Sequence, residues 1–246
     1  MKTSNPALRA KALRGSALGI GTVQAMTVNG AVNKTAFMLI LLLISASWVW
    51  KTYFTEGLAA VTPWMTIGLV GGLITALVTI FVNKWSPITA PVYAVLEGLF
   101  LGGITAVFEQ KYPGLAFQAV ALTFGTLFML LTAYKAGIVR ATEKFKAGVV
   151  AATGGIFIVY LASFVLGLFG VRIPHIYGSG IIGIGFSVVV VVIAALNLVL
   201  DFDFIESAAR ENMPKYFEWY GGFAIMVTLV WLYIEILNLL AKLRDR

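Results

Sequence analysis

The sequence predicts an all-α integral membrane protein with seven transmembrane helices. Of its 246 residues, 60% are hydrophobic and only 12% are charged, whereas soluble domains carry roughly a quarter charged residues. The mean hydropathy of +0.92 indicates helices that face lipid. There is no cysteine, which excludes a disulfide framework and thiolate metal sites.

Seven segments with few or no charges are long enough to cross the hydrocarbon core, which needs roughly 20 apolar residues. Trp and Tyr gather near the ends of these segments, as is typical at the headgroup level. The last segment either spans the membrane or is re-entrant. In chain order the segments are residues 35–50 (to 54 if Lys51 snorkels), 57–83, 85–108, 112–134, 147–171, 173–200 and 219–241.

Residues 1–34 are predicted to form a flexible basic tail before a membrane domain of residues 35–246. The first apolar run starts only at Ala36, so the tail lacks the early apolar core of a signal peptide. With this tail in the cytoplasm, seven crossings put 12 of the 18 Lys and Arg residues on the same side. The positive-inside rule therefore favours a cytoplasmic N-terminus.

Three soluble or enzymatic functions are disfavoured. The G-x-G-x-x-G run at residues 178–183 has no preceding strand, so it is interpreted as a packing face rather than a nucleotide site. His175 lies near Ser179, but it is the only histidine and a triad needs a third, orienting group. The basic residues lie in short clusters between apolar runs, which disfavours nucleic-acid binding. We expect no enzyme activity and no cofactor.

Acidic residues inside or beside the spans are the candidate functional groups. Glu97 interrupts the third span and Glu235 the seventh. An ionised carboxylate in a bilayer costs several kcal/mol, so each should be protonated, paired or facing water. Asp201 and Asp203 follow the sixth span, where acids at a helix C-terminus would oppose the macrodipole unless a proton or cation binds.

Clustered carboxylates can share a proton or hold a divalent cation, because like charges held close cannot all ionise. Calcium takes several oxygen ligands in flexible geometry, which makes Asp201 and Asp203 candidate calcium ligands. The two positions are about 200° apart on a helix. We therefore expect one of them to matter more than the other.

Several stretches resemble the Bax-inhibitor-1-like family of membrane proteins. The segment LEGLFLGG at residues 96–103 is similar to the family's LEGLSLG motif. Residues 122–134 and the FKAG run at 145–148 resemble its next helix and turn, and Phe202-Asp203 resembles its FDT or YDT acid. The run LYIEILNLL at residues 232–240 is similar to LYLDIINLF in its last helix. The resemblance covers roughly residues 36–243.

This resemblance implies a seven-helix protein whose bacterial members are pH-sensitive calcium leaks, gated by two acids that share a proton. Carried over, Asp203 and Glu235 are those acids. Two departures weaken the transfer. The family's DTQ tail is absent, and 32 residues separate the two acids. A hairpin near residues 213–214 would place Asp203 opposite residues 223–224, which makes Glu218 a rival partner.

The expected function is therefore a proton-sensitive calcium leak channel in the bacterial inner membrane. Its gate is expected among Asp201, Asp203, Glu218 and Glu235, with Glu97 as a further intramembrane acid. The expected partners are the lipid bilayer, calcium ions and protons. Two other functions stay open: a proton-coupled small-solute transporter, and a non-conducting regulator that acts through partner proteins.

Overall fold

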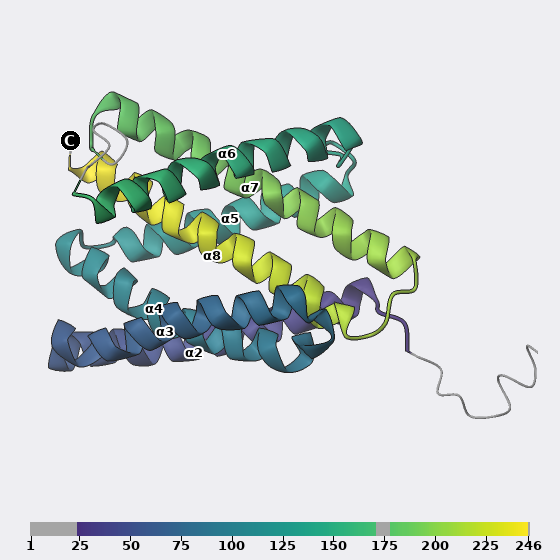
Figure 1. The fold of residues 1–246 in the computed structure, drawn as a ribbon, viewed down its shortest axis with the longest axis horizontal. Helices are drawn as coiled ribbons and strands as arrows, with labels where there is room; N and C mark the ends of the chain where they lie inside the picture. The colour runs from purple at the N-terminus through teal and green to yellow at the C-terminus, as the bar shows by residue number, and fades with distance from the viewer. Residues whose placement is uncertain (1–23, 171–177, 246) are drawn as a thin grey trace, which may run out of the picture.

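The computed structural model describes residues 24–170 and 178–245. Within these residues, seven α-helices are long and apolar enough to cross a membrane, which confirms the predicted fold class (Figure 1). The elements are α2 (Val28–Glu56), α3 (Leu58–Phe81), the short 3-10 helix η1 (Asn83–Trp85), α4 (Ser86–Lys111), α5 (Leu115–Lys135), α6 (Glu143–Leu168), α7 (Ile181–Arg210) and α8 (Phe217–Arg244).

Several helices extend beyond the spans expected from charge positions, and α2 and α7 do so by the most residues. α2 begins at Val28 instead of residue 35, because the Thr27 side chain accepts a hydrogen bond from the Gly30 N–H at 2.9 Å and caps the helix. Residues 1–23 of the predicted tail, and the loop that holds His175, lie outside the described residues.

α7 continues to Arg210, ten residues beyond the predicted end of its span. Asp201 and Asp203 are therefore inside the helix, and the expectation that they sit at its C-terminus is wrong. Charge marked the end of the apolar segment, whereas the helix itself ends at Arg210. Asn212, two residues later, has the left-handed φ of 55° common just after a helix, and Pro214 follows.

α8 crosses the whole bundle. The Tyr216 carbonyl, just before α8, accepts a hydrogen bond from Ser86 at the start of α4 (2.9 Å). At the other end of α8, Arg244 donates to the Pro113 carbonyl (2.9 Å) just after α4. Because α8 is as long as the complete α4, it spans the bundle and is not re-entrant.

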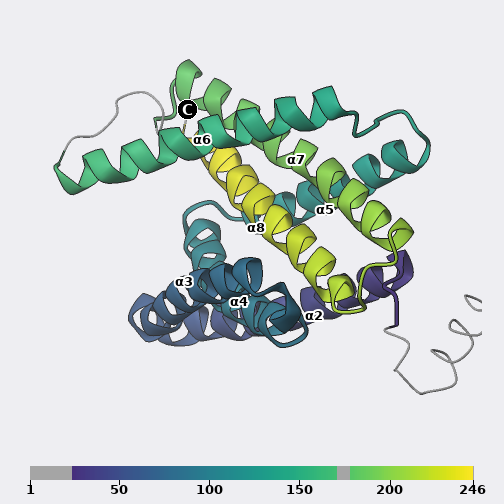
Figure 2. The same cartoon turned by 45° about the vertical axis from the view of Figure 1, so that its right-hand side comes forward.

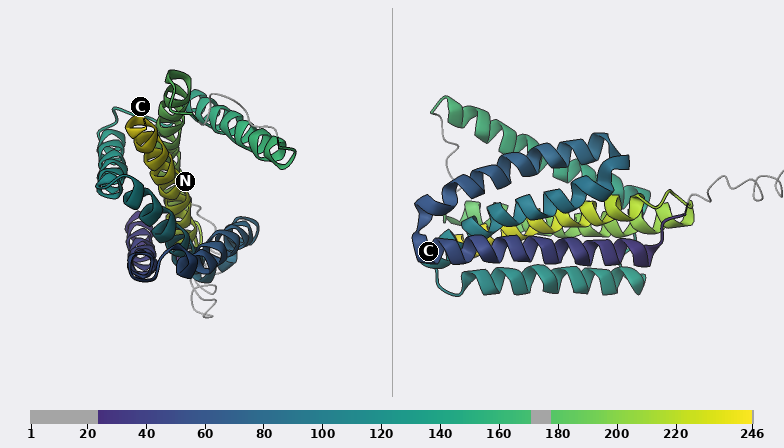
Figure 3. Two further views of the ribbon diagram at one scale, coloured as in Figure 1. Left: turned by 90° about the vertical axis from the view of Figure 1, so that its left-hand side faces the viewer. Right: turned by 90° about the horizontal axis from the view of Figure 1, so that it is seen from below.

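The bundle has two ends, which we name by the path of α2. The tail end is where α2 begins at Val28, and the far end is where α2 finishes at Glu56. Viewed along its length, the bundle holds α8 near its centre (Figure 3, left). α8 packs against α2, α4, α5 and α7 and is the most buried helix.

Glycines bring α2, α3 and α4 close together. A Cβ on Gly98 or Gly102 of α4 would collide with the α2 backbone, and one on Gly68 of α3 would collide with the α4 backbone. Small residues that let helix backbones approach are a main source of association energy in lipid. By contrast, α6 is the least buried helix and lies at the edge of the bundle beside α7 (Figure 2).

We expect Gly98→Ala to destabilise the protein by about 1–3 kcal/mol, the usual cost of overpacking. The added methyl group would meet the Ser45 hydroxyl and the Leu42 carbonyl. Gly125→Ala on α5 is the matched control, because its Cβ would meet nothing within 4 Å. Thermal unfolding in detergent should show a lower midpoint for Gly98→Ala alone, and equal midpoints would contradict this packing.

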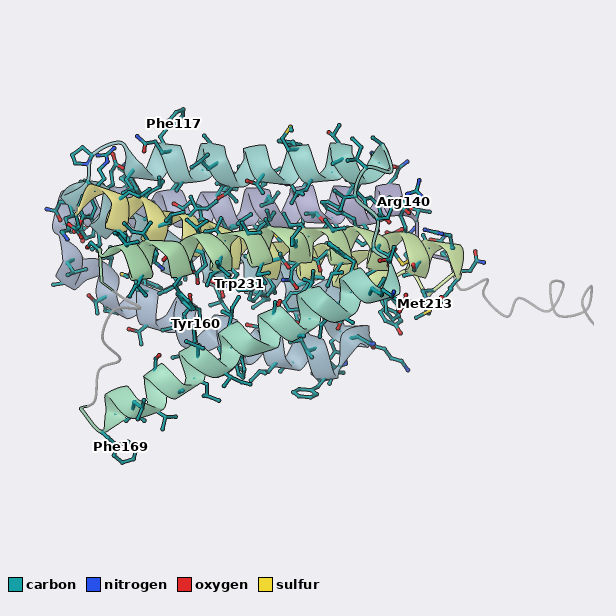
Figure 4. The ribbon with its side chains drawn as sticks, turned by 90° about the horizontal axis from the view of Figure 1, so that it is seen from above. Phe117, Arg140, Tyr160, Phe169, Met213 and Trp231 are labelled. Carbon is teal, nitrogen blue, oxygen red and sulfur yellow. The ribbon has the colours of Figure 1, made fainter. Side chains whose placement is uncertain are left out.

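Cysteines at Arg140 and Asp245 should react from opposite sides of the membrane. Arg140 lies in the α5–α6 loop at the tail end (Figure 4), and Asp245 follows α8 at the far end. The chain has no cysteine of its own, so each variant carries one thiol. An impermeant maleimide should label one variant in intact vesicles and the other only after permeabilisation. Labelling of both from one side would refute seven crossings.

Candidate functional site

Three acidic residues in the inner parts of the membrane-spanning helices contact other elements of the bundle. Asp201 lies on α7, Glu235 on α8 and Glu97 on α4. Figure 4 shows the bundle with the side chains around them, including Tyr160 and Trp231, which contact Glu235.

Asp201 faces α8. Its side chain is within hydrogen-bonding reach of the Thr228 hydroxyl, while its Oδ2 atom is buried and has no hydrogen-bond partner in the described part of the chain. A buried acceptor without a partner costs about 1–3 kcal/mol, and more if it is charged. Binding of a proton or a cation would therefore be stabilised more at this oxygen than elsewhere in the α7–α8 interface.

Asp203 faces away from that interface. It forms an ion pair with Lys146 near the start of α6 at 2.8 Å, and Lys146 also contacts Glu143 at 3.3 Å. The Asp203 side chain is 20% exposed. The two aspartates thus occupy different faces of α7, as the helical period implied.

The described residues contain no group of three His, Cys, Asp or Glu side chains that could hold a metal ion. Asp201 and Asp203 point to different partners and do not form one ligand set. A resident calcium ion held by this pair therefore has no geometric support in the described conformation.

Glu235 is buried at the α6–α8 contact. Its Oε1 accepts hydrogen bonds from the Tyr160 hydroxyl at 2.8 Å and from the Trp231 indole N–H at 3.3 Å. Tyr160 belongs to α6, and this bond crosses the space between α6 and the body of the bundle (Figure 4). Glu235 therefore ties the loosely packed α6 to the central helix.

A polar cavity of about 500 Å³ opens beside Glu235 toward the far end. Lys242 extends into this region and donates to the Ser187 hydroxyl at 2.9 Å and to the Gly183 carbonyl at 3.2 Å. The cavity is lined by Tyr160, Ser179, Phe186, Ser187, Ile234, Glu235, Asn238, Ala241, Lys242 and Asp245. Glu235 is thus the only one of the candidate acids Asp201, Asp203, Glu218 and Glu235 that lines this cavity.

Asp201 and Glu235 lie at different depths of the same interface. Asp201 is opposite Thr228, and Glu235 is seven positions further along α8, about 10 Å along the helix axis. The two acids do not share a hydrogen bond in this conformation. Asp203, which lies nearer the tail end, is still further from Glu235.

Glu218 has a different environment from the other candidate acids. It is 3% exposed, and its Oε1 accepts hydrogen bonds from the Thr27 N–H and the Thr27 hydroxyl, both at 3.1 Å. The positive end of the α2 dipole stabilises a carboxylate at this position. Glu218 thus fastens the start of α2 to the start of α8.

Glu97 lies away from the α7–α8 interface. Its carboxyl packs beside Gly72 of α3 and within hydrogen-bonding reach of Tyr93, one turn earlier on α4. It belongs to the group of three helices that the glycines bring together.

Comparison with known protein families now adds an independent finding. The family model described as Bax inhibitor 1 like matches residues 4–245, nearly the whole chain. The chain belongs to this family. The comparison with curated proteins finds no match.

In this Bax inhibitor 1-like protein, the segment that resembled the family's first motif has a packing role. Gly98 and Gly102 of that segment lie against α2, while Glu97 points to α3. The segment in the last helix carries Glu235, and Trp231, which immediately precedes this segment, donates a hydrogen bond to that acid.

Sequence reasoning missed the residues that contact these acids. Thr228 and Tyr160 look like ordinary residues of apolar spans, as do Asn197 and Thr153, which join α7 to α6 through a 2.8 Å hydrogen bond. A signal was present, since each is a polar group within a membrane segment. However, no local pattern says which polar groups meet.

We expect Glu218→Ala to destabilise the protein by about 0.5–1.5 kcal/mol, because it removes the acceptor of the part-buried hydrogen bonds from the Thr27 N–H and the Thr27 hydroxyl. If the protein conducts ions, the flux through the folded fraction should stay unchanged. Glu211→Ala is the matched control, since Glu211 is exposed. A normal melting midpoint together with altered flux would instead assign Glu218 to the gate.

Proposed function

We propose that this Bax inhibitor 1-like protein is a pH-sensitive calcium leak channel in which ions pass along the interface of α7 and α8. The observation that carries the proposal is the buried Oδ2 of Asp201, which has no partner in the described residues. Family membership and the seven apolar helices supply the setting.

Polar groups at successive depths support this route. The far-end cavity reaches Glu235, Asp201 lies about 10 Å deeper, and Asp203 with Lys146 marks the tail end. Charged side chains within membrane segments are rare and commonly mark ion or proton pathways. Between Glu235 and Asp201 the interface is closed by apolar side chains, among them Leu198 and Leu232, both fully buried.

The described conformation suits a neutral Asp201. Its side chain has the Thr228 hydroxyl as a neighbour, but Oδ2 has no partner in the described residues. Such a carboxylic acid is tolerable when protonated, whereas its ionised form needs water, further donors or a cation. Loss of the proton should therefore favour an arrangement in which α7 and α8 separate and water or calcium reaches Asp201. On this account flux rises as pH rises through the titration of Asp201.

Calcium acts in this proposal as a passing ion. Conduction requires sites that attract an ion but release it, and isolated carboxylates about 10 Å apart fit that requirement better than a cage of many oxygens. The N-terminus and the α5–α6 loop are proposed to face the cytoplasm of a bacterial cell, because most Lys and Arg residues lie on that side.

A proton-coupled transporter of a small solute is the second candidate. The cavity beside Glu235 has a volume of about 500 Å³, which lies in the range of small-molecule sites. Calcium-loaded proteoliposomes separate the candidates. A channel passes calcium down its gradient, a transporter moves protons only when its solute is present, and a non-conducting regulator moves neither.

Asp201→Asn should give a low calcium flux that no longer depends on pH. The amide keeps the shape of the protonated acid but cannot ionise, so it holds the closed arrangement. A coupling free energy of about 1.4 kcal/mol between ionisation of Asp201 and opening of the interface would change the open fraction roughly tenfold. The measurement is calcium efflux from proteoliposomes across a series of pH values.

Asp203→Asn is the matched control, because Asp203 is partly exposed and paired with Lys146. It should keep the pH response of the parent. If instead Asp201→Asn retains the parent's flux and midpoint while Asp203→Asn loses them, the gate lies at the tail-end ion pair and the proposed route is wrong.

A further inference from the structure

A second cavity, which we call the lateral cavity, lies on the other side of α8 from the polar one. Its volume is about 400 Å³, and its walls come from α2, α4, α5 and α8. Leu43, Ala46 and Trp50 line it from α2, and Ala116 and Val120 from α5. None of the acids discussed above lines it.

α2 and α5 flank the mouth of the lateral cavity. Among the described helices, each packs against α4 and α8, and no substantial contact joins α2 to α5. Leu43 and Phe117, which line the cavity, are 48% and 79% exposed on the lipid-facing surface. The mouth therefore opens sideways between two membrane-spanning helices, where the surrounding medium is lipid rather than water.

The walls of the lateral cavity are largely apolar, because its inner hydroxyl groups are already paired and Ser47 lies at the exposed mouth. Thr105 and Tyr233 share a hydrogen bond of 2.9 Å, and Thr123 donates to the Ala119 carbonyl at 2.8 Å. A water molecule needs two to four polar partners, which these walls do not offer. The occupant must therefore be apolar.

The depth of the lateral cavity matches one leaflet. Along α2 it extends from Leu39 to Trp50, 11 positions or about 16 Å, and half of a hydrocarbon core is about 15 Å. Trp50 stands at its far-end limit, where an indole ring fits the headgroup level. Leu39 and Phe124 close it near mid-membrane.

Cationic side chains lie at the headgroup level of the same end. Lys51 follows Trp50 directly. Lys111, whose side chain is 64% exposed and forms an ion pair with Asp245 at 3.4 Å, and Arg244 lie at the turn from which α5 starts. These charges suit the phosphate of a phospholipid whose chain enters between α2 and α5.

We propose that the lateral cavity binds one acyl chain of a bilayer phospholipid from the far-end leaflet. The chain lies against the floor formed by α4 and α8 and fills the space that α2 and α5 leave open. Lipid at this position contacts Tyr233 and Val230, so it packs against the same helix that carries Glu235.

The test is photolabelling of the full chain in phosphatidylcholine vesicles that contain a phosphatidylcholine with a diazirine in its acyl chain. Peptide mapping by mass spectrometry should find adducts on the floor, at residues 229–233 and 101–105, which α2 and α5 shield from the surrounding lipid. Adducts restricted to outward-facing side chains would overturn the proposal.

Ala116→Phe should abolish the floor adducts, because the ring fills the cavity next to its far-end limit. Ala121→Phe on the same helix is the control: Ala121 is exposed and does not line the cavity, so the floor adducts should persist. If Ala116→Phe fails to fold, Ser47→Phe at the exposed part of the mouth tests the same point. Floor adducts that survive a filling variant would refute the site.

A free fatty acid is the competing source of an acyl chain. An excess of unlabelled oleate should leave the floor adducts of the photoreactive phosphatidylcholine in place if a phospholipid is the occupant. Loss of these adducts with oleate, but not with excess unlabelled phosphatidylcholine, would overturn the phospholipid assignment.

Discussion

Every polar atom that the helices carry into the hydrocarbon layer needs a partner from the protein, because lipid offers none. Most of them meet this constraint locally: the hydroxyls of Thr35, Ser45 and Thr123, for example, donate to carbonyls one turn earlier on their own helices. Glu235 meets it with donors from two helices. Glu218 meets it by capping α2.

Two buried side-chain atoms in the described residues lack a hydrogen-bond partner, the Tyr112 hydroxyl and the Asp201 Oδ2. Tyr112 follows the last residue of α4, with the Lys111 ammonium 4.6 Å from its ring centre, so headgroups and water are near. Asp201 lies within α7 and has no such neighbour. This difference is why the functional account depends on Asp201.

Much of the fold could be predicted because hydrophobicity and charge decide which segments enter a bilayer. The seven spans and the two acids inside them follow from that rule. The course of α7 beyond Leu200 does not follow from that rule, because a helix continues through charged residues once its backbone hydrogen bonds are formed. The partners of the acids were also hidden: Asp201 meets Thr228 and Asp203 meets Lys146 only because the angle and register of α7 bring them there.

The bundle has a tight part and a loose part. α2, α3 and α4 approach through glycines that tolerate no added Cβ, whereas α6 rests on α7 and reaches α8 through the Tyr160–Glu235 bond. Movement of α6 would therefore disturb few close backbone contacts, whereas α7 packs closely against α8. Of the candidate acids, Glu235 lies on this loose side because Tyr160 of α6 contacts it, whereas Asp201 is buried in the close α7–α8 contact.

Infrared difference spectroscopy of the reconstituted protein tests the central claim most directly. The claim is that Asp201 is a neutral carboxylic acid in the closed arrangement and releases its proton when the interface opens. A band of a protonated carboxyl group should disappear as pH is raised, and Asp201→Asn should remove that band while Asp203→Asn leaves it unchanged. A spectrum in which Asp201→Asn alters no carboxyl band would contradict the account.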